Sequence, residues 1–211
     1  MKPVSIFTGV MAAIGISIAF ILLTACHNTS RVAFYTLNAQ ISHQSNKTNS
    51  VELNNIAVGI GSIHLPTYLD RPQIVTLKGV SQLHLAEFHR WAGPLDGEIA
   101  QVMMNNLSNL LGTSQVIIYP WTRSQTPEFR LDLTFQHFEG TLGDTMRIQG
   151  VWRLFQNTPK GVYVHQPFDH IITIKGMGYE NLVTACNQGL WNLSKDISLI
   201  VQRKLAMSTH N

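Results

Sequence analysis

The stretch EFRLDLTFQHFEGTLGDTMRIQGVWRLFQ, residues 128–156, decides the fold. In its first half every second side chain is apolar, at Phe129, Leu131, Leu133 and Phe135. Side chains of a β-strand alternate between its two faces, so this pattern predicts a strand with one buried and one wet face. The short segment 140–144 is typical of a turn, and a second strand-like run follows it. The stretch therefore predicts an antiparallel pair of strands.

Strand-like runs on both sides extend this pair into a sheet. After a second turn at 157–161, the run GVYVHQPFDHIITIKG predicts a third strand and completes a meander. The earlier runs are VAFYTL at 32–37, NNIAVGIGSIHLP at 54–66, PQIVTLKGVSQLHLAEF at 72–88 and VIIYPW at 116–121. The run at 72–88 predicts two strands that turn near Gly79. The glycines of GIGSIH, residues 59–64, indicate a bulge or a close backbone approach.

Two segments have the period of an amphipathic helix. In the first, Asp96 is the expected N-cap, Glu98 lies in the first turn and Gly112 ends the helix. Its apolar stripe is Ile99, Val102, Met103, Leu107, Leu110 and Leu111. The second spans roughly 179–205 and is expected to bury Leu182, Val183, Cys186, Leu190, Leu193, Ile197, Val201 and Leu205. Each layer has one apolar face, which predicts an α/β domain: a central mixed, mostly antiparallel sheet covered by two main amphipathic helices.

The N-terminal segment 4–25 is apolar and carries no charge. It is long enough to cross a bilayer core of ~30 Å, so length does not distinguish a permanent anchor from a removable signal peptide. The sequence LTAC, residues 23–26, matches the bacterial lipobox, where a signal peptidase cleaves before the cysteine and the thiol receives diacylglycerol. We therefore predict a signal peptide at 1–25 and lipidation of Cys26 with acyl chains such as palmitate. An uncleaved anchor with an incidental cysteine is the alternative.

Lipidation of Cys26 sets the expected organisation and location. A short tether at 26–31 would lead into one domain at 32–206 and a C-terminal tail at 207–211. In the bacterial sorting rule, Asp directly after the cysteine favours the inner membrane; this chain has His27, so we expect the periplasmic face of the outer membrane. An acylated Cys26 cannot pair with Cys186, the only other cysteine, which we expect to be a small buried residue on a helix.

Composition and spacing argue against several function classes. The formal charge is +3 and the Lys and Arg residues form no basic stripe, so we expect no nucleic-acid partner. The nine histidines include no HExxH motif, and paired cysteine ligands are missing. We therefore expect no metal site and no other cofactor.

Sequence motifs for catalysis are also missing. There is no GxSxG nucleophile elbow and no phosphate-binding loop. Ser62 and His64 would share one strand face, which keeps a Ser-His hydrolase as the enzymatic alternative. We interpret four carboxylates as outward-facing strand and turn residues, namely Asp132, Glu139, Asp144 and Asp169. We predict that the protein is not an enzyme and has no catalytic residues.

The segments LPTYLDRPQIV, residues 65–75, and FHRWAGPLD, residues 88–96, combine aromatic, apolar and charged side chains. A structural connection, in which Asp70 and Arg71 satisfy local backbone groups, is the plain interpretation. Aromatic residues and Arg are enriched in interface hot spots, so we also hypothesise a partner-binding surface. Its candidate residues are Tyr68, Leu69, Asp70, Arg71, Arg90 and Trp91.

Four segments of the chain resemble the PqiC family of auxiliary lipoproteins from ABC-type and MCE-type transport systems. They are FYTL at 34–37, VGIGSIHLPTYLDRPQIVTL at 58–77, LAEFHRWAGPLDGEIAQVMMNNLSNLLG at 85–112 and VIIYPW at 116–121. The resemblance implies an α/β domain similar to the N-terminal domain of TolB, with no catalytic residues. It also implies an outer-membrane lipoprotein that supports membrane integrity and works with an MCE-domain, PqiB-like partner in lipid transport.

Our leading hypothesis is therefore a non-enzymatic, lipid-anchored subunit whose exposed loops dock the MCE-domain partner. The alternative is a lipid-binding periplasmic carrier or chaperone, which would need an apolar cavity between sheet and helices. Open sheet edges would also allow a homo-oligomer without requiring one. The sequence leaves open which lipid is moved and in which direction.

Overall fold

The computed structural model describes residues 31–40, 57–122, 125–156 and 163–208. The chain divides into two compact units, Met1–Val32 and Ala33–Asn211, and every element below belongs to the second. The predicted signal peptide and Cys26 lie outside the described residues. Within the described ranges, no helix is both long enough and apolar enough to span a membrane.

The described residues form eight strands, two α-helices and one 3-10 helix. The strands are β1 (Ala33–Tyr35), β2 (Val58–His64), β3 (Gln73–Lys78), β4 (Gln82–Trp91), β5 (Val116–Ile118), β6 (Phe129–Gly140), β7 (Thr145–Gln156) and β8 (Tyr163–Thr173). The helices are η1 (Thr67–Leu69), α2 (Leu95–Leu111) and α3 (Tyr179–Ser208). Each predicted strand run contains a strand, and Gly79, with a φ of +74°, lies in the turn between β3 and β4 as expected.

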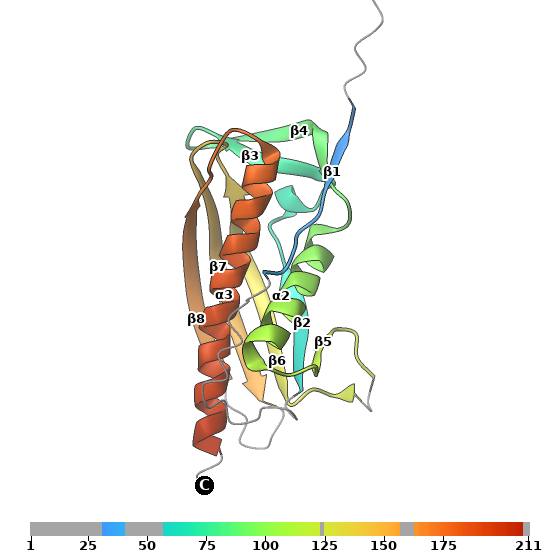
Figure 1. The fold of residues 1–211 in the computed structure, drawn as a ribbon, viewed down its shortest axis with the longest axis vertical. Coiled ribbons are helices and arrows are strands. Elements are labelled where there is room, and N and C mark those ends of the chain that lie inside the picture. Colours follow the sequence, from blue (N-terminus) through green and yellow to red (C-terminus); the bar gives the residue numbers. More distant parts are fainter. Residues whose placement is uncertain (1–30, 41–56, 123–124, 157–162, 209–211) are drawn as a thin grey trace, which may run out of the picture. The chain divides into compact units, whose positions relative to one another are not determined.

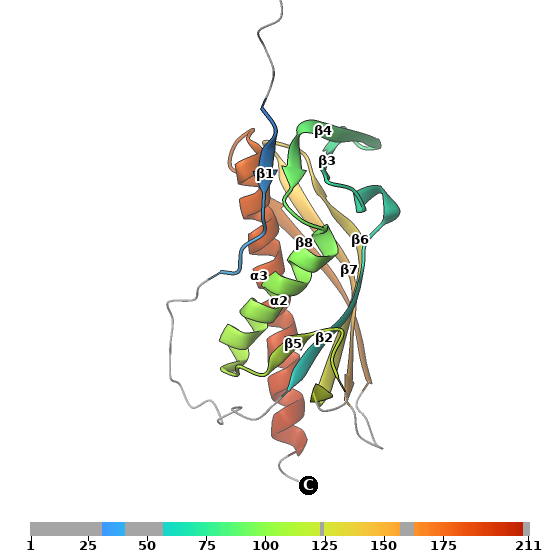
Figure 2. The ribbon, with the colours of Figure 1, turned by 90° about the vertical axis from the view of Figure 1, so that its right-hand side faces the viewer.

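All eight strands belong to one mixed sheet, as predicted. β6, β7 and β8 form the expected antiparallel meander, and β3 pairs antiparallel with β4. The pairs β1–β4, β2–β5, β2–β6 and β3–β6 are parallel, and the two longest ladders are antiparallel. β3 meets β6 at one registered position, Thr76 opposite Gly140, so most of the β3–β4 hairpin lies beyond the rest of the sheet (Figure 2).

Both α-helices cover the same face of the sheet. Figure 1 shows α2 and α3 in front of the strands, and the turned view of Figure 2 shows both on one side of them. The core lies between these two layers, and its largest fully buried side chains include Trp152, Phe129, Ile60, Ile99, Met103, Leu107, Leu131 and Leu133. The predicted α/β domain with one sheet and two main helices is thereby confirmed; the likeness to TolB stays a prediction.

Helix α2 begins earlier than the sequence pattern predicted. Leu95 is its first residue and Pro94, with φ of −58° and ψ of 129°, occupies the N-cap position, so the prediction of Asp96 as N-cap was wrong. Proline fits at this boundary because a helix start has no partner for its backbone N–H in any case. Gly112 ends the helix as expected, with a φ of +66° and its N–H donating to the carbonyl of Ser108.

The predicted apolar stripes of α2 and α3 are buried, except for Leu110 on α2. One polar residue of α2 is also buried, which the sequence pattern did not predict. Leu110 is half-buried, whereas Asn106 is fully buried against α3, where its amide contacts the Ser194 hydroxyl at 3.3 Å. On α3 the predicted stripe is buried from Leu182 to Val201, and the side chain of Leu205 lies outside the described residues. Cys186 is a free, buried thiol on this helix, as predicted.

The chain after β1 is fixed to both helices through side-chain acceptors. One oxygen of Glu98 on α2 accepts the backbone N–H of Leu37 at 2.9 Å and the Thr36 hydroxyl at 2.7 Å. The side-chain oxygen of Asn187 on α3 accepts the backbone N–H of Asn38 at 3.0 Å. These bonds hold the N-terminal end of the domain in place, directly after the predicted tether.

The predicted irregularity in the GIGSIH run is present in β2. The register between β2 and β6 shifts between Ile60 and Ile63. A Cβ atom on Gly61 would lie 2.1 Å from Asp132 Oδ1, and that oxygen accepts the backbone N–H of Ser62 at 3.1 Å. Gly61 therefore leaves the space that the Asp132 carboxylate occupies.

Candidate functional site

The two segments predicted to bind a partner lie side by side. The backbone N–H of Trp91 donates to the carbonyl of Pro72 at 2.7 Å, and Gln73 is opposite Arg90 in the β3–β4 register. The antiparallel pairing of β3 with β4 therefore brings the loop that contains η1 next to the end of β4. We call this pair of segments, residues 67–72 and 88–92, the η1–β4 surface.

The six candidate residues divide into buried and accessible ones. Leu69 is 3% exposed and Trp91 is 5% exposed, so both side chains belong to the core in this structure. The other four are accessible: Asp70 is exposed, and Tyr68, Arg71 and Arg90 are half-buried. A partner-binding role for these residues stays a prediction, now confined to the accessible four.

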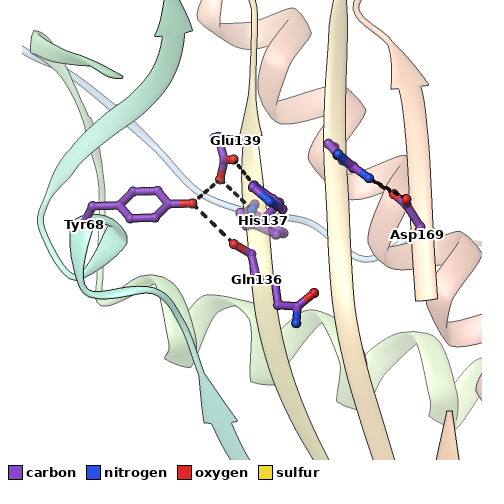
Figure 3. Close-up of polar contacts among 7 residues, drawn as sticks. Tyr68, Gln136, His137, Glu139 and Asp169 are labelled. Atoms are coloured by element: carbon purple, nitrogen blue, oxygen red, sulfur yellow. Dashed lines mark hydrogen bonds and ion pairs between the residues drawn. The ribbon is translucent and has the colours of Figure 1, made fainter. Parts of the chain in front are cut away.

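Tyr68 connects η1 to the end of β6. Its hydroxyl donates to Glu139 Oε2 at 2.7 Å and lies 3.5 Å from the carbonyl oxygen of Gln136 (Figure 3). Burial, and then the hydrogen bond to the Glu139 carboxylate, raise the pKa of Tyr68 well above its ordinary value. The phenol is therefore a neutral donor at any pH relevant to the protein.

Glu139 is the centre of this contact, and the interpretation of it as an outward-facing residue was wrong. Its side chain is 3% exposed and takes hydrogen bonds from three groups. Besides Tyr68, they are the backbone N–H of Phe138 at 2.8 Å and His137, whose Nδ1 lies 2.6 Å from Oε1. A buried carboxylate is tolerated because these donors replace the water it has lost.

The burial of Glu139 results from cover by Tyr68 of η1 on the sheet face away from the helices, where the registered partner of Glu139 is the exposed Arg147. The register between β6 and β7 shifts between Phe135 and His137, so the alternation that begins at Phe129 does not continue to the strand end. Beyond the bulge, Phe138 and Glu139 are both buried, on opposite faces of the strand. No residue type in this stretch marks the bulge, so the sequence carried no signal for it.

The remaining three carboxylates behave differently from one another. Asp144 and Asp169 are exposed, as predicted, whereas Asp132 is 6% exposed and bonded to Arg130, so the outward placement of Asp132 was wrong. Asp169 receives two hydrogen bonds from Arg147, at 3.0 and 2.7 Å. The Arg147 guanidinium lowers the pKa of Asp169 below its ordinary value. Figure 3 shows Asp169 on β8 and His137 on β6, with β7 between them.

Two arginines of the η1–β4 surface have unsatisfied donors. The Nε atoms of Arg71 and Arg90 are shielded from solvent, and neither has a hydrogen-bond acceptor in the part of the chain that the structure describes. Burial of a charged donor without an acceptor is unfavourable, and guanidinium groups bind carboxylates and phosphates with paired hydrogen bonds. The shielded Nε atoms are out of reach of a partner, so an anionic group from outside the domain would meet the accessible part of these two half-buried guanidinium side chains.

The structure gives no geometric support to the Ser62–His64 hydrolase alternative. Both residues are exposed on β2, and within residues 57–122, 125–156 and 163–208 no carboxylate is hydrogen-bonded to His64. The carboxylate that contacts this segment, Asp132, accepts a hydrogen bond from the backbone N–H of Ser62 and not from a histidine. The same described ranges contain no group of three or more His, Cys, Asp or Glu residues placed to hold a metal ion.

A groove between β8 and α3 bears on the lipid-carrier alternative. It has a volume of about 360 Å³ and is lined by charged side chains, including Asp169, His170, Asp196 and Arg203, together with apolar ones such as Leu199. It is open to solvent and its charged lining lies beside the core residues Trp152 and Phe168, whereas a carrier would need an enclosed apolar cavity to shield acyl chains. This groove therefore does not favour the carrier alternative.

Comparison with known proteins gives a family and a fold. A family model described as "ABC-type transport auxiliary lipoprotein component" matches residues 35–198, which confirms the resemblance found in the sequence. The crystal structure of an uncharacterized protein aligns with a TM-score of 0.65 and 22% identity over 81% of this chain and 99% of that chain. A protein from Xanthomonas campestris aligns with a TM-score of 0.66 and 11% identity over 85% of this chain and 100% of that chain. No curated protein matches the chain.

Proposed function

The chain belongs to the family of ABC-type transport auxiliary lipoprotein components, and from this membership we propose that it is an outer-membrane subunit of an intermembrane phospholipid transport system. Acylated Cys26 holds the domain on the periplasmic face of the membrane, and the η1–β4 surface docks an MCE-domain, PqiB-like partner. The observation that carries the proposal is the family match over residues 35–198, which includes both segments of this surface.

The chemistry of the η1–β4 surface supports a docking role. Asp70 is exposed, and Arg71 and Arg90 have buried Nε donors that lack acceptors among the described residues. A carboxylate or C-terminal group on the partner would pair with the accessible part of these guanidinium groups. Tyr68 keeps η1 in a fixed position through Glu139, so the charged groups of the loop are held ready and less ordering entropy is lost on binding.

Copurification of the full chain from membranes tests the docking role. Arg71→Gln combined with Arg90→Gln removes both guanidinium groups and is expected to reduce the yield of the transport partner by about tenfold or more, since hydrogen-bonded charged pairs at interfaces contribute ~2 kcal/mol or more. Arg71→Lys with Arg90→Lys is the matched control, because it keeps the charge and loses the paired geometry; an intermediate yield is expected. Unchanged yield in the Gln variant would refute the surface as the docking site.

Mass spectrometry of the mature N-terminus tests the anchor. We expect a first residue of Cys26 carrying diacylglycerol and an additional acyl chain, because multiple chains are needed for stable anchoring. A chain that retains Met1 would contradict lipidation and favour the uncleaved anchor. Self-association through open sheet edges stays a prediction, and the mass of the purified complex would decide it.

A further inference from the structure

The β3–β4 hairpin exposes several large apolar side chains. Val80, in the turn, is 97% exposed, and three residues of β4 follow it: Leu83 at 40%, Leu85 at 44% and Phe88 at 39%. Phe34 on the neighbouring strand β1 is 66% exposed. Single exposed apolar residues are ordinary, but five of them on one hairpin and its adjacent strand indicate an interaction surface.

These side chains are spread from the tip of the hairpin to its base. Leu83 and Leu85 are two apart and share one face of β4. Val75 pairs with Leu85 but Gln73 pairs with Arg90, so β4 has three extra residues between these pairs and its alternation is interrupted before Phe88. Phe34 is opposite Arg90 in the parallel β1–β4 register, two residues from Phe88. The exposed apolar side chains therefore extend from the tip of the hairpin along β4 to the neighbouring strand β1.

The base of the hairpin is held firmly by the domain. The Tyr35 hydroxyl lies 2.8 Å from His89 Nδ1, and the rings of His89 and Tyr179 stack with centroids 4.0 Å apart. β1 pairs with the last three residues of β4, so the point where the chain enters the domain is fixed beside the hairpin. Figures 1 and 2 both show the start of β1 and the hairpin at the same end of the domain.

The length of the tether limits how far this end can lie from a lipid anchor. Ala33 is seven residues after Cys26. A fully extended chain spans at most ~3.6 Å per residue, so the start of β1 lies within about 25 Å of an acylated Cys26. The end of the domain that carries the exposed apolar residues is therefore the end that acylation would bring to the bilayer.

We propose that the β3–β4 hairpin, with Val80 at its tip, rests in the interfacial region of the phospholipid bilayer and is a second membrane contact beside the lipid anchor. The inference depends on the proposed anchoring through Cys26. The charges of the hairpin suit such a surface: Lys78 balances the single carboxylate, Glu87, so no net negative charge repels anionic phospholipids.

The backbone of β4 limits the depth of this contact. Residues 82–88 have no strand partner on their outer edge among the described residues, since β1 pairs with positions 89–91. Unpaired N–H and C=O groups are costly in hydrocarbon but can bind water between the headgroups. The hairpin therefore lies at headgroup level, with its apolar side chains reaching the start of the acyl chains.

A single fluorophore at the hairpin tip tests this contact in the full-length lipoprotein. Val80→Cys is labelled with an environment-sensitive probe after purification from membranes, and the protein is reconstituted on phosphatidylethanolamine–phosphatidylglycerol vesicles. Labelling is selective, because Cys26 is blocked by acylation and Cys186 is buried, which raises the pKa of its thiol. Leu199→Cys is the matched control, since Leu199 is 51% exposed on the half of α3 at the opposite end of the domain (Figure 1).

The expected result is a blue shift of the Val80→Cys probe and its quenching by lipids brominated on the acyl chains, with neither effect at Leu199→Cys. Flotation of the vesicles reports anchoring separately. Protein that floats while the Val80→Cys probe is unquenched would overturn the membrane contact and leave the anchor intact. Protection of the probe by an added transport partner but not by lipid would also overturn it, in favour of protein docking. Protein that does not float would refute the anchoring and the contact together.

Discussion

Tyr68 and Glu139 form the contact on which the η1–β4 surface rests. One phenol donates to a carboxylate that is 3% exposed, and the carboxylate has two further donors in β6. The network is satisfied within the domain, so its first role is to position the loop rather than to perform chemistry. The contact thereby holds the loop that carries Asp70 and Arg71 against β6.

Tyr68→Phe removes one donor from the buried Glu139 carboxylate. We expect the free energy of unfolding to fall by about 1–3 kcal/mol, the usual cost of leaving a buried acceptor with a missing hydrogen bond. Urea unfolding of the full chain measures it. Tyr119→Phe is the matched control, because Tyr119 is 62% exposed and its change should be close to zero. Equal effects of the two substitutions would contradict a specific role for the Tyr68 hydroxyl.

The Arg147–Asp169 pair gives a dependence of stability on pH. The pKa of Asp169 is lowered in the folded state, so the carboxylate stabilises the fold above its ordinary pKa of ~3.9, and this contribution is lost as the pH falls through the folded value. The difference in unfolding free energy between the wild type and Asp169→Asn should therefore be constant near neutrality and shrink below about pH 4. A difference that grows as the pH falls would refute this sign.

High salt gives an independent check of the same pair. Both side chains are about two-fifths exposed, at 44% and 41%, so solvent ions can screen them. At 1 M salt the Debye length is only ~3 Å, and the difference between wild type and Asp169→Asn should become smaller. A difference that does not respond to salt would indicate that packing, not charge, determines it.

The elements show where local chemistry predicts structure and where it does not. Gly112 could be placed at the end of α2 because glycine is favoured in the left-handed conformation that ends a helix. The start of α2 could not, because Asp96 and Pro94 are both acceptable near a helix start and only the path of the preceding strand decides between them. Likewise, the burial of Glu139 is a tertiary effect, because Tyr68 covers it from η1, a segment far away in the sequence.

Alanine substitutions of two glycines, one inside α2 and one at its C-cap, should change the free energy of unfolding in opposite directions. Gly112→Ala places a Cβ at a φ of +66° with no atom within 4 Å, so the effect is conformational; we expect a loss of about 1 kcal/mol in unfolding free energy. Gly97 lies within the helix, also with open space around it, and Gly97→Ala should stabilise the protein by up to about 1 kcal/mol. Urea unfolding of both variants checks the pair, and the same sign for both would contradict the assigned helix end.

At the scale of the whole molecule, hydrophobic period was sufficient to predict the layers of the fold. Alternation over 129–135 indicated one buried face of the sheet, and the apolar stripes on α2 and α3 indicated one buried face on each helix. Packing the helices onto the sheet buries all three faces. The strand order could not be predicted, because the parallel pairs β1–β4, β2–β6 and β3–β6 join segments far apart in the chain. Trp91 and Leu69 are buried in the core of the folded domain, although residue type had placed them among the predicted partner-binding residues.

The two proposed interactions use different parts of one end of the domain. The hairpin is proposed to contact lipid through Val80 and its neighbours, and the η1–β4 surface is proposed to bind the transport partner through Asp70, Arg71 and Arg90. Both surfaces include residues of β4, so a partner docked on the second would be held close to the bilayer. The position suits a subunit that receives a lipid-conducting partner at the membrane.

Photocrosslinking from position 70 in intact envelopes tests the central claim most directly. A photoreactive amino acid replaces Asp70 in the full chain, the matched control carries it at Leu199, and crosslinked products are identified by mass spectrometry. The account predicts that position 70 captures an MCE-domain transport protein and that position 199 does not. Capture of no envelope protein at position 70, or the same products from both positions, would contradict it.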